Sequence, residues 1–235
     1  MSVKKYDDIL FDADDTLFDY KKAETVALQK TLAYFGHAYD HDIQTEYRLI
    51  NQSLWHELEM KKITVDELQV ERFKLLFRKT GVKESADDFN SHYLNELADG
   101  TQLISGAQKL CDDLSQFFRL TIVTNGISRT QRRRFGKSTI KKDFEALFIS
   151  GDIGFQKPQT ELFDYVFASL QIADKNRVLM VGDNLSTDIL GGINAGIDTC
   201  WFNCNKAINK TKIKADFEIQ SLDELHKIVF PDQIR

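Results

Sequence analysis

Two carboxylates stand immediately after a short apolar run, with one residue between them. The run is Ile9-Leu-Phe11, and the carboxylates are Asp12 and Asp14. Alternate side chains of a strand point to the same face, so a strand extended through residue 14 would place both carboxylates on one side. Two like charges ~4 Å apart repel by ~4 kcal/mol near a protein surface, so the pair calls for a cation, a shared proton or a positive neighbour. Taken alone, the two residues fit a solvated acidic turn as well as a catalytic site.

The elements that must hold this pair follow from the pattern of apolar residues. Residues 22–98 carry apolar side chains at helical spacing and contain no convincing strand. Further along, short apolar runs alternate with helical stretches, and the runs cover residues 120–124, 146–150, 178–181 and 199–202. Strands roughly thirty residues apart with helices between them are typical of βαβ units and a parallel sheet. We therefore expect an α/β fold with a Rossmann-like parallel-sheet core, residues 1–17 and 99–235, and an inserted α-helical cap domain, residues 18–98.

Polar clusters follow the other predicted strands as well. Ligands of open parallel sheets bind at the carboxyl ends of the strands, so the residues at those ends are the ones expected to face a substrate. These residues are Thr124, Asn125 and Gly126 after the second strand, Lys157 after the third, and Asp183 and Asp188 after the fourth. We expect all of them to share one edge of the sheet with the opening pair of carboxylates.

The acidic members of this group suit a metal ion. Asp12, Asp14, Asp183 and Asp188 form an all-oxygen set of the kind that binds a hard divalent cation. Mg²⁺ is the expected cofactor, because it is commonly shared between carboxylates and a substrate phosphate. A bound cation would also relieve the repulsion between the carboxylates.

The remaining polar residues suit a phosphoryl group. Thr124 offers a hydroxyl, Asn125 and Gly126 offer amides at a predicted helix start, and Lys157 offers a positive charge. An aspartate can attack phosphorus to form an aspartyl-phosphate, and a second carboxyl can protonate the leaving oxygen and then activate water. Each cluster alone could be a turn, a solvated loop or a helix cap, but four clusters at four strand ends favour catalysis. We expect Asp12 to attack and Asp14 to transfer the proton.

Composition narrows the classes of partner. The chain has 235 residues, a net charge of −5 and three cysteines, which form no C-x-x-C motif. The acidic charge argues against nucleic acid or a membrane surface as partner, and no apolar run reaches the ~20 residues that span a bilayer. Neither a disulfide framework nor a zinc site is favoured, and we expect a cytoplasmic monomer or homodimer. The basic run from Arg129 to Lys142 is expected on a solvated helix.

The strand-end motifs resemble those of the haloacid dehalogenase-like (HAD) hydrolase superfamily, in particular subfamily I with a helical C1 cap. The matching motifs are Asp12-Ala-Asp-Asp-Thr16, Thr124, Lys157, and Gly182-Asp183 through Asp188. The resemblance implies Mg²⁺ dependence and an aspartyl-phosphate intermediate, with Asp12 and Asp183 as side-chain metal ligands and Asp14 contributing its backbone carbonyl. Since dehalogenases lack an acid at the position of Asp14, carbon–halogen cleavage is disfavoured, and phosphonatase activity is disfavoured for the same reason. Gly151 departs from the pattern, because many relatives have glutamate there.

Within the superfamily, the motifs look like those of YjjG-type pyrimidine 5′-nucleotidases, which hydrolyse pyrimidine and non-canonical nucleoside monophosphates. The expected substrate is therefore a small phosphate monoester, and the expected enzyme a phosphoric monoester hydrolase. The alternatives are a capped phosphatase or phosphomutase for sugar phosphates, and a non-catalytic binding protein on the same fold. Trp55, Asp19 and Tyr20 are the candidates for contact with the leaving group, whereas Phe73 and Tyr93 fit the cap core better.

Overall fold

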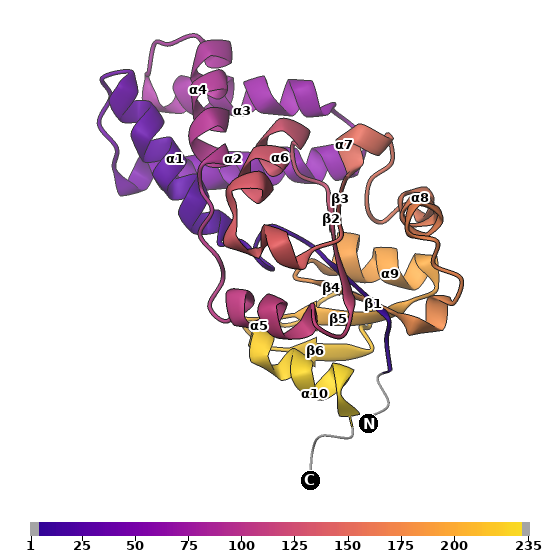
Figure 1. Ribbon diagram of the computed structural model, residues 1–235. Coiled ribbons are helices and arrows are strands. Elements are labelled where there is room, and N and C mark those ends of the chain that lie inside the picture. The colour runs from indigo at the N-terminus through magenta and orange to yellow at the C-terminus, as the bar shows by residue number, and fades with distance from the viewer. Residues whose placement is uncertain (1–4, 232–235) are drawn as a thin grey trace. The chain divides into compact units, whose positions relative to one another are not determined.

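The computed structural model describes residues 5–231 and divides the chain into two compact units (Figure 1). The first, here the core unit, combines Met1–Asp19 with Thr101–Arg235, and the second, here the helical unit, is the continuous segment Tyr20–Gly100. The core unit is therefore assembled from two stretches of chain that lie on either side of an insertion.

The core unit is built on one six-stranded sheet in which every strand pair is parallel. In sequence order the strands are β1 (Asp8–Phe11), β2 (Arg119–Thr124), β3 (Ala146–Ile149), β4 (Val178–Gly182), β5 (Asp198–Phe202) and β6 (Phe217–Ile219). Their order in space is β3-β2-β1-β4-β5-β6, so β1 lies between β2 and β4. The predicted α/β fold is confirmed. The edge strand β6 was not predicted, because three residues are too short for a periodic signal.

Helices cover both faces of the sheet, as the alternation of side chains along a strand requires. Along β1, Ile9 and Phe11 join one apolar cluster with α5 and α10, while Leu10 joins another with α8. The helices of this unit are α5 (Ala107–Leu114), α6 (Ser128–Lys137), α7 (Ser150–Ile153), α8 (Thr160–Leu170), α9 (Leu190–Ala195) and α10 (Leu225–Val229). A π-helical turn, η3 (Leu185–Ile189), follows β4.

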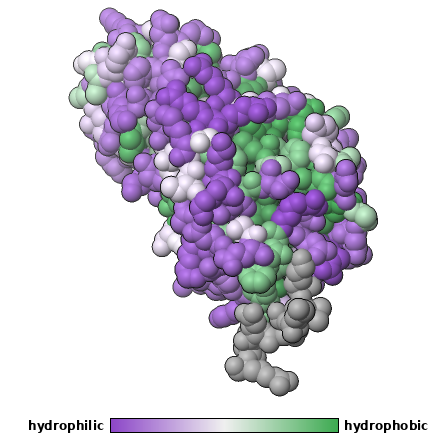
Figure 2. Space-filling model, viewed as in Figure 1, coloured by the Kyte–Doolittle hydropathy of each residue, from purple (hydrophilic) through white to green (hydrophobic). Residues whose placement is uncertain are grey.

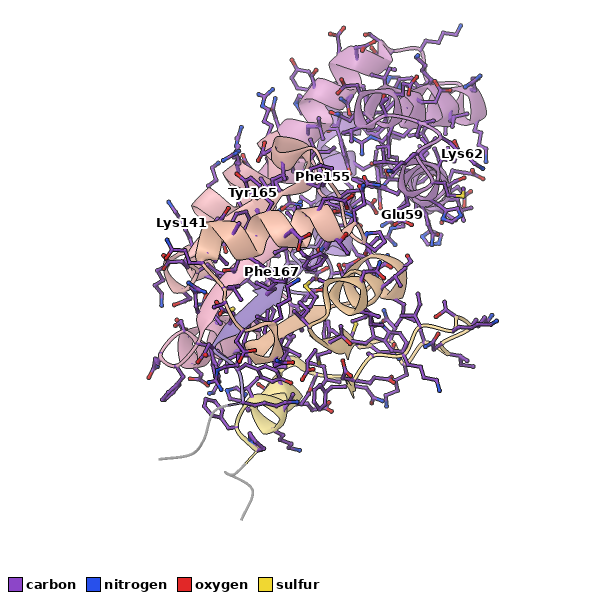
Figure 3. All side chains as sticks on the ribbon, turned by 90° about the vertical axis from the view of Figure 1, so that its right-hand side faces the viewer. Glu59, Lys62, Lys141, Phe155, Tyr165 and Phe167 are labelled. Carbon is purple, nitrogen blue, oxygen red and sulfur yellow. The ribbon has the colours of Figure 1, made fainter. Side chains whose placement is uncertain are left out.

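Helix α8 illustrates how the covering helices divide their side chains. Phe167 is buried and packs against Phe163, while Tyr165 on the same helix is exposed (Figure 3). Hydrophilic residues cover most of the visible surface, with a hydrophobic area on the side of α8 and α9 (Figure 2). The partly exposed Phe155 and Ile193 belong to this part of the chain.

Four helices make up the helical unit: α1 (Tyr20–Tyr34), α2 (His41–Glu59), α3 (Val65–Thr80) and α4 (Ala86–Ala98). Their shared core is aromatic, and stacked or tilted rings join α2, α3 and α4. Phe73 and Tyr93 are fully buried in this core. They therefore belong to the packing of the unit, as their apolar spacing indicated.

A buried polar network crosses the interior of the helical unit. The guanidinium of Arg72 on α3 donates to Asn90 Oδ1 on α4 at 2.8 Å, and Asn51 on α2 donates to Glu24 on α1 at 3.1 Å. Arg72 also contacts Asn51 at 3.5 Å, so one network joins all four helices. Since each of these side chains is buried, the network adds directional contacts to an otherwise apolar core.

The two ends of the helical unit approach each other closely. At Gly100, an added Cβ would lie 2.6 Å from the Cβ of Ala23, so only glycine permits this spacing. On the core side of the insertion, the N–H of Asp19 donates to the carbonyl of Gln102 at 2.9 Å. The two ends of the insertion therefore lie close together in the helical unit, and the two chain segments that flank the insertion lie close together in the core unit. Across residues 5–231, no helix combines the length and apolar character needed to cross a membrane.

Candidate active site

The site is assembled where the three central strands end. Asp12 follows β1 directly, and its N–H donates to the carbonyl of Val181 on β4 at 2.9 Å. The parallel register places Phe11 beside Ile122 on one side and Val181 on the other. Residues that follow the ends of β2 and β4 must therefore flank Asp12.

Lys157 is the positive charge at the centre of the site. Its side chain is 1% exposed, and Nζ donates to Asp12 Oδ1 at 2.6 Å, to Asp188 Oδ1 at 2.7 Å and to the carbonyl of Val123 at 2.6 Å. Burial alone would lower the pKa of the ammonium, but the two carboxylates outweigh it and raise the pKa. Lys157 therefore stays charged and holds Asp12 by an ion pair.

Three carboxylates lie together at this point. One oxygen each of Asp12, Asp183 and Asp188 lie within 4.8 Å of one another. Burial, opposed by Lys157 and reinforced by Asp188, raises the pKa of Asp12 to about 7. Burial, together with its two acidic neighbours, also raises the pKa of Asp183 well above its usual range. The cluster thus holds more negative charge than one lysine balances, and a cation would relieve it.

The donor set fits Mg²⁺, since it consists of carboxylate oxygens only. Within the cluster, Asp188 is already engaged, because Oδ2 accepts from the N–H of Asn184 at 3.0 Å while Oδ1 accepts from Lys157. Gly182 makes room for this arrangement, as an added Cβ would lie 2.3 Å from Asp188 Oδ2. Asp12, Asp183 and Asp188 can therefore each offer an oxygen to a metal ion, and Asp188 in addition pairs with Lys157.

Asp14 lies apart from that cluster and has partners of its own. Its Oδ2 accepts from Gln131 Nε2 at 2.6 Å, and its Oδ1 is paired with the guanidinium of Arg134. Asp12 and Asp14 are thus paired with different basic side chains, Asp12 with Lys157 and Asp14 with Arg134. The side chain of Asp14 does not join the three carboxylates of the predicted metal site.

Sequence reasoning missed Gln131 and Arg134. The expectation of a solvated basic helix holds for the exposed Arg129, Arg132, Arg133 and Lys137 but is wrong for Arg134, which is 0% exposed. Gln131 on the same helix is 2% exposed. A stripe of buried polar residues gives no hydropathy signal, since apolar periodicity is what marks a buried face. The spacing of Thr130, Gln131 and Arg134 along one helical face is the signal that could have been used.

The turn after β2 differs in part from the predicted phosphate cradle. Thr124 is buried at the strand end, and its Oγ1 accepts from the N–H of Gly126 at 3.1 Å. The side chain of Asn125 instead binds the backbone of Lys157. It donates to the Lys157 carbonyl at 3.0 Å and accepts from the Lys157 N–H at 2.9 Å. The following helix has Ile127 as its N-cap and starts at Ser128, so Asn125 and Gly126 lie just before it.

The departure at Gly151 has a structural counterpart. An added Cβ at Gly151 would lie 2.8 Å from Ser128 Oγ, so a larger residue would require that side chain to move. The neighbouring Asp152 is turned to Arg132 at 2.7 Å and not to the lysine. The carboxylates that hold Lys157 are therefore those of Asp12 and Asp188.

The candidates for leaving-group recognition lie in different units. Asp19 closes the first stretch of the core unit, whereas Tyr20 opens α1 and accepts from Asn51 at 3.4 Å. Trp55 is half-buried against the apolar cluster of the helical unit. Their contact with a substrate stays a prediction.

Comparison with known proteins gives a consistent result. A model of the haloacid dehalogenase-like hydrolase family matches residues 9–202. The pyrimidine 5′-nucleotidase PynA of Streptococcus pneumoniae is 36% identical over 94% of this chain and 93% of its own length. The pyrimidine 5′-nucleotidase YjjG of Escherichia coli is 32% identical over 96% of this chain and 98% of its own. The magnesium-bound crystal structure of the HAD-hydrolase YfnB of Bacillus subtilis is 39% identical, covers 96% of this chain and 99% of that one, and superposes with a TM-score of 0.91.

Proposed function

Because the chain belongs to the haloacid dehalogenase-like hydrolase family, we propose that it is a Mg²⁺-dependent phosphatase of pyrimidine and non-canonical nucleoside 5′-monophosphates. The observation that carries the proposal is the Asp12 carboxylate at the end of β1, paired with buried Lys157 and next to Asp183. The substrate class follows the two relatives named pyrimidine 5′-nucleotidases.

The reaction would proceed in two steps. In the first, the free carboxylate oxygen of Asp12 attacks phosphorus, the bond to the 5′ oxygen breaks, and Asp14 gives that oxygen a proton. In the second, Asp14 takes a proton from water, which attacks the aspartyl-phosphate and releases inorganic phosphate. Asp12 and Asp14 both return to their starting states.

The surrounding groups would act by charge and position. Lys157 keeps Asp12 oriented and offsets negative charge near the phosphoryl oxygens, and the Thr124 hydroxyl can donate to one of them. Mg²⁺, held by the Asp12 and Asp183 side chains and the backbone carbonyl of Asp14, would supply further charge neutralisation when bound. All of these residues belong to the core unit.

A second candidate is a phosphatase or phosphomutase for sugar phosphates. It is favoured by relatives named glyceraldehyde 3-phosphate phosphatase and N-acylneuraminate-9-phosphatase, at 28% and 26% identity. The core residues address only the phosphoryl group, so they serve either substrate class equally.

A substrate panel with the intact protein separates these functions. We expect Mg²⁺-dependent phosphate release from pyrimidine nucleoside 5′-monophosphates, with kcat/KM higher than for hexose phosphates, and abolition of activity by EDTA. A preference for sugar phosphates, or isomerisation without phosphate release, would overturn the nucleotidase proposal. Asp12→Asn is the variant that tests the covalent step, and unchanged turnover would overturn that step alone.

A further inference from the structure

We propose that Gln131 and Arg134 are positioning residues that together hold Asp14 for proton transfer to the leaving group, an inference that rests on the proposed phosphatase function. The two side chains are here called the α6 clamp. They bind one carboxylate oxygen of Asp14 each, Gln131 at 2.6 Å from Oδ2 and Arg134 at Oδ1.

The clamp is built into the fold and is not a chance surface contact. Gln131 and Arg134 lie three residues apart on α6, which places them on neighbouring turns of one face. The Arg134 guanidinium is fully buried and lies 5.7 Å from the ring centre of Phe18, whose backbone bridges to Asp14. A buried guanidinium is costly unless it is paired or hydrogen-bonded, and Asp14 Oδ1 accepts a hydrogen bond from it.

Gly126, in the turn before α6, leaves the space that the Gln131 side chain occupies. At Gly126 an added Cβ would lie 2.1 Å from Gln131 Nε2, the atom that bonds Asp14. The first turn of α6 is tied down in addition, because the N–H of Gln131 donates to the carbonyl of Ile127 at 2.9 Å. Because Gly126 has no Cβ, the side-chain amide of Gln131 can lie against the backbone at this point while it bonds Asp14.

The clamp matches the state of Asp14 that arises during the reaction. When Asp14 gives its proton to the leaving oxygen, it becomes a carboxylate, and an amide N–H and a guanidinium N–H are already placed to bond that carboxylate. Donors arranged in advance for a developing charge lower the barrier without reorganisation. The clamp thus directs Asp14 toward its role as acid and then as base.

The leaving group decides how much this positioning matters. A nucleoside leaves through an alkyl oxygen, which needs a proton, whereas 4-nitrophenolate leaves as a stable anion and gains little from an acid. Loss of correctly placed general acid catalysis should therefore slow the nucleotide selectively. A loss of folding or of phosphate binding would instead affect both esters equally.

The experiment compares kcat/KM for uridine 5′-monophosphate and 4-nitrophenyl phosphate in Gln131→Met, Arg134→Gln and Arg134→Lys. We expect losses on the order of 10–100-fold with the nucleotide and about threefold or less with the nitrophenyl ester, with partial recovery in Arg134→Lys. The matched control is Arg132→Gln on the same helix, whose side chain is 64% exposed and pairs with Asp152, and it should change neither value.

A double variant tests whether Arg134 acts through Asp14. Asp14→Asn combined with Arg134→Gln should be no slower with the nucleotide than Asp14→Asn alone. Equal losses with both esters in Gln131→Met and Arg134→Gln, or additive losses in the double variant, would overturn the clamp. Gln131→Met keeps the buried charge paired, so it stays informative if Arg134→Gln does not fold. Wild-type protein that hydrolyses neither ester would overturn the proposed function itself, and the clamp with it.

Discussion

Replacing Lys157 by Met should destabilise the core unit strongly, because it removes a cation that pairs with two buried carboxylates. At the observed 2.6 and 2.7 Å, each ion pair represents about 6 kcal/mol of attraction at an effective dielectric of ~20. The net cost is smaller, because desolvation already offsets part of this attraction and the carboxylates can take up protons. Removal of one partner of a buried pair typically costs about 3–5 kcal/mol. Methionine keeps most of the side-chain volume, so a cavity adds little.

The chain offers a direct assay for this change. It contains two tryptophans, of which Trp201 lies on β5 of the core unit and Trp55 lies in the helical unit. In a Trp55→Phe background, the fluorescence of Trp201, whose indole N–H donates to the Asp183 carbonyl at 2.8 Å, reports the core alone. A loss of 3–5 kcal/mol corresponds to a fall in Tm of about 6–20 °C for a chain of this size.

Magnesium supplies the internal check. Because the variant removes the ammonium that pairs with Asp12 and Asp188, added Mg²⁺ should raise its Tm more than it raises that of the wild type. The control is Lys109→Met, which removes an exposed lysine paired with Asp113 and should leave Tm unchanged. An unchanged Tm in Lys157→Met without metal would refute the electrostatic reasoning.

Three further outcomes follow from the same structure. Gly182→Ala should abolish activity and lower Tm, since the added Cβ would collide with the side chain of Asp188. Its control is Gly136→Ala on α6, where the added Cβ has open space and should stabilise the protein by about 0.5–1 kcal/mol. Equal Tm values for the two variants would contradict this prediction. The pKa of Asp12 is raised to about 7, so below pH 7 a binding Mg²⁺ ion must displace a proton from this carboxyl. The affinity for Mg²⁺, measured by calorimetry, should therefore fall up to about tenfold per pH unit between pH 7 and 5, and an affinity that does not change with pH would contradict this prediction. Arg72→Met should destabilise the helical unit by about 3–5 kcal/mol in denaturant, since buried partners lose their cation, and an unchanged midpoint would show the network to be dispensable.

The sheet was predictable from sequence because its strands are short apolar runs that end in polar residues. The ends of β1 and β4 were recognisable for that reason, and Asp12 and Asp183 do lie close together. The periodicity of apolar residues indicates where apolar side chains are buried, but it does not indicate where charged side chains are buried. Arg134 was therefore assigned to solvent, although it is among the most buried side chains of the core unit.

Roles of polar side chains were harder to predict than positions. Asn125 follows β2 as expected, but its amide bonds the backbone of Lys157, which depends on a loop 32 residues further along the chain. Asp188 lies in the acidic cluster as expected, but its two oxygens also accept from Asn184 and Lys157, which the sequence did not indicate. Such choices depend on which partners the folded chain brings near, and spacing along the sequence does not contain that information.

The close approach of Ala23 and Gly100 bears on how the chain folds. The central strand β1 must pair with β2 across the whole insertion, with Asp8 opposite Arg119. Closing a flexible loop of roughly 80 residues costs roughly 4 kcal/mol of chain entropy beyond a constant term. If the helical unit folds first, its two ends are already joined, and β1 then meets β2 as though the strands were near neighbours in sequence. The insertion would then act as a folding aid for the sheet, shortening the effective distance over which its central pair must find each other.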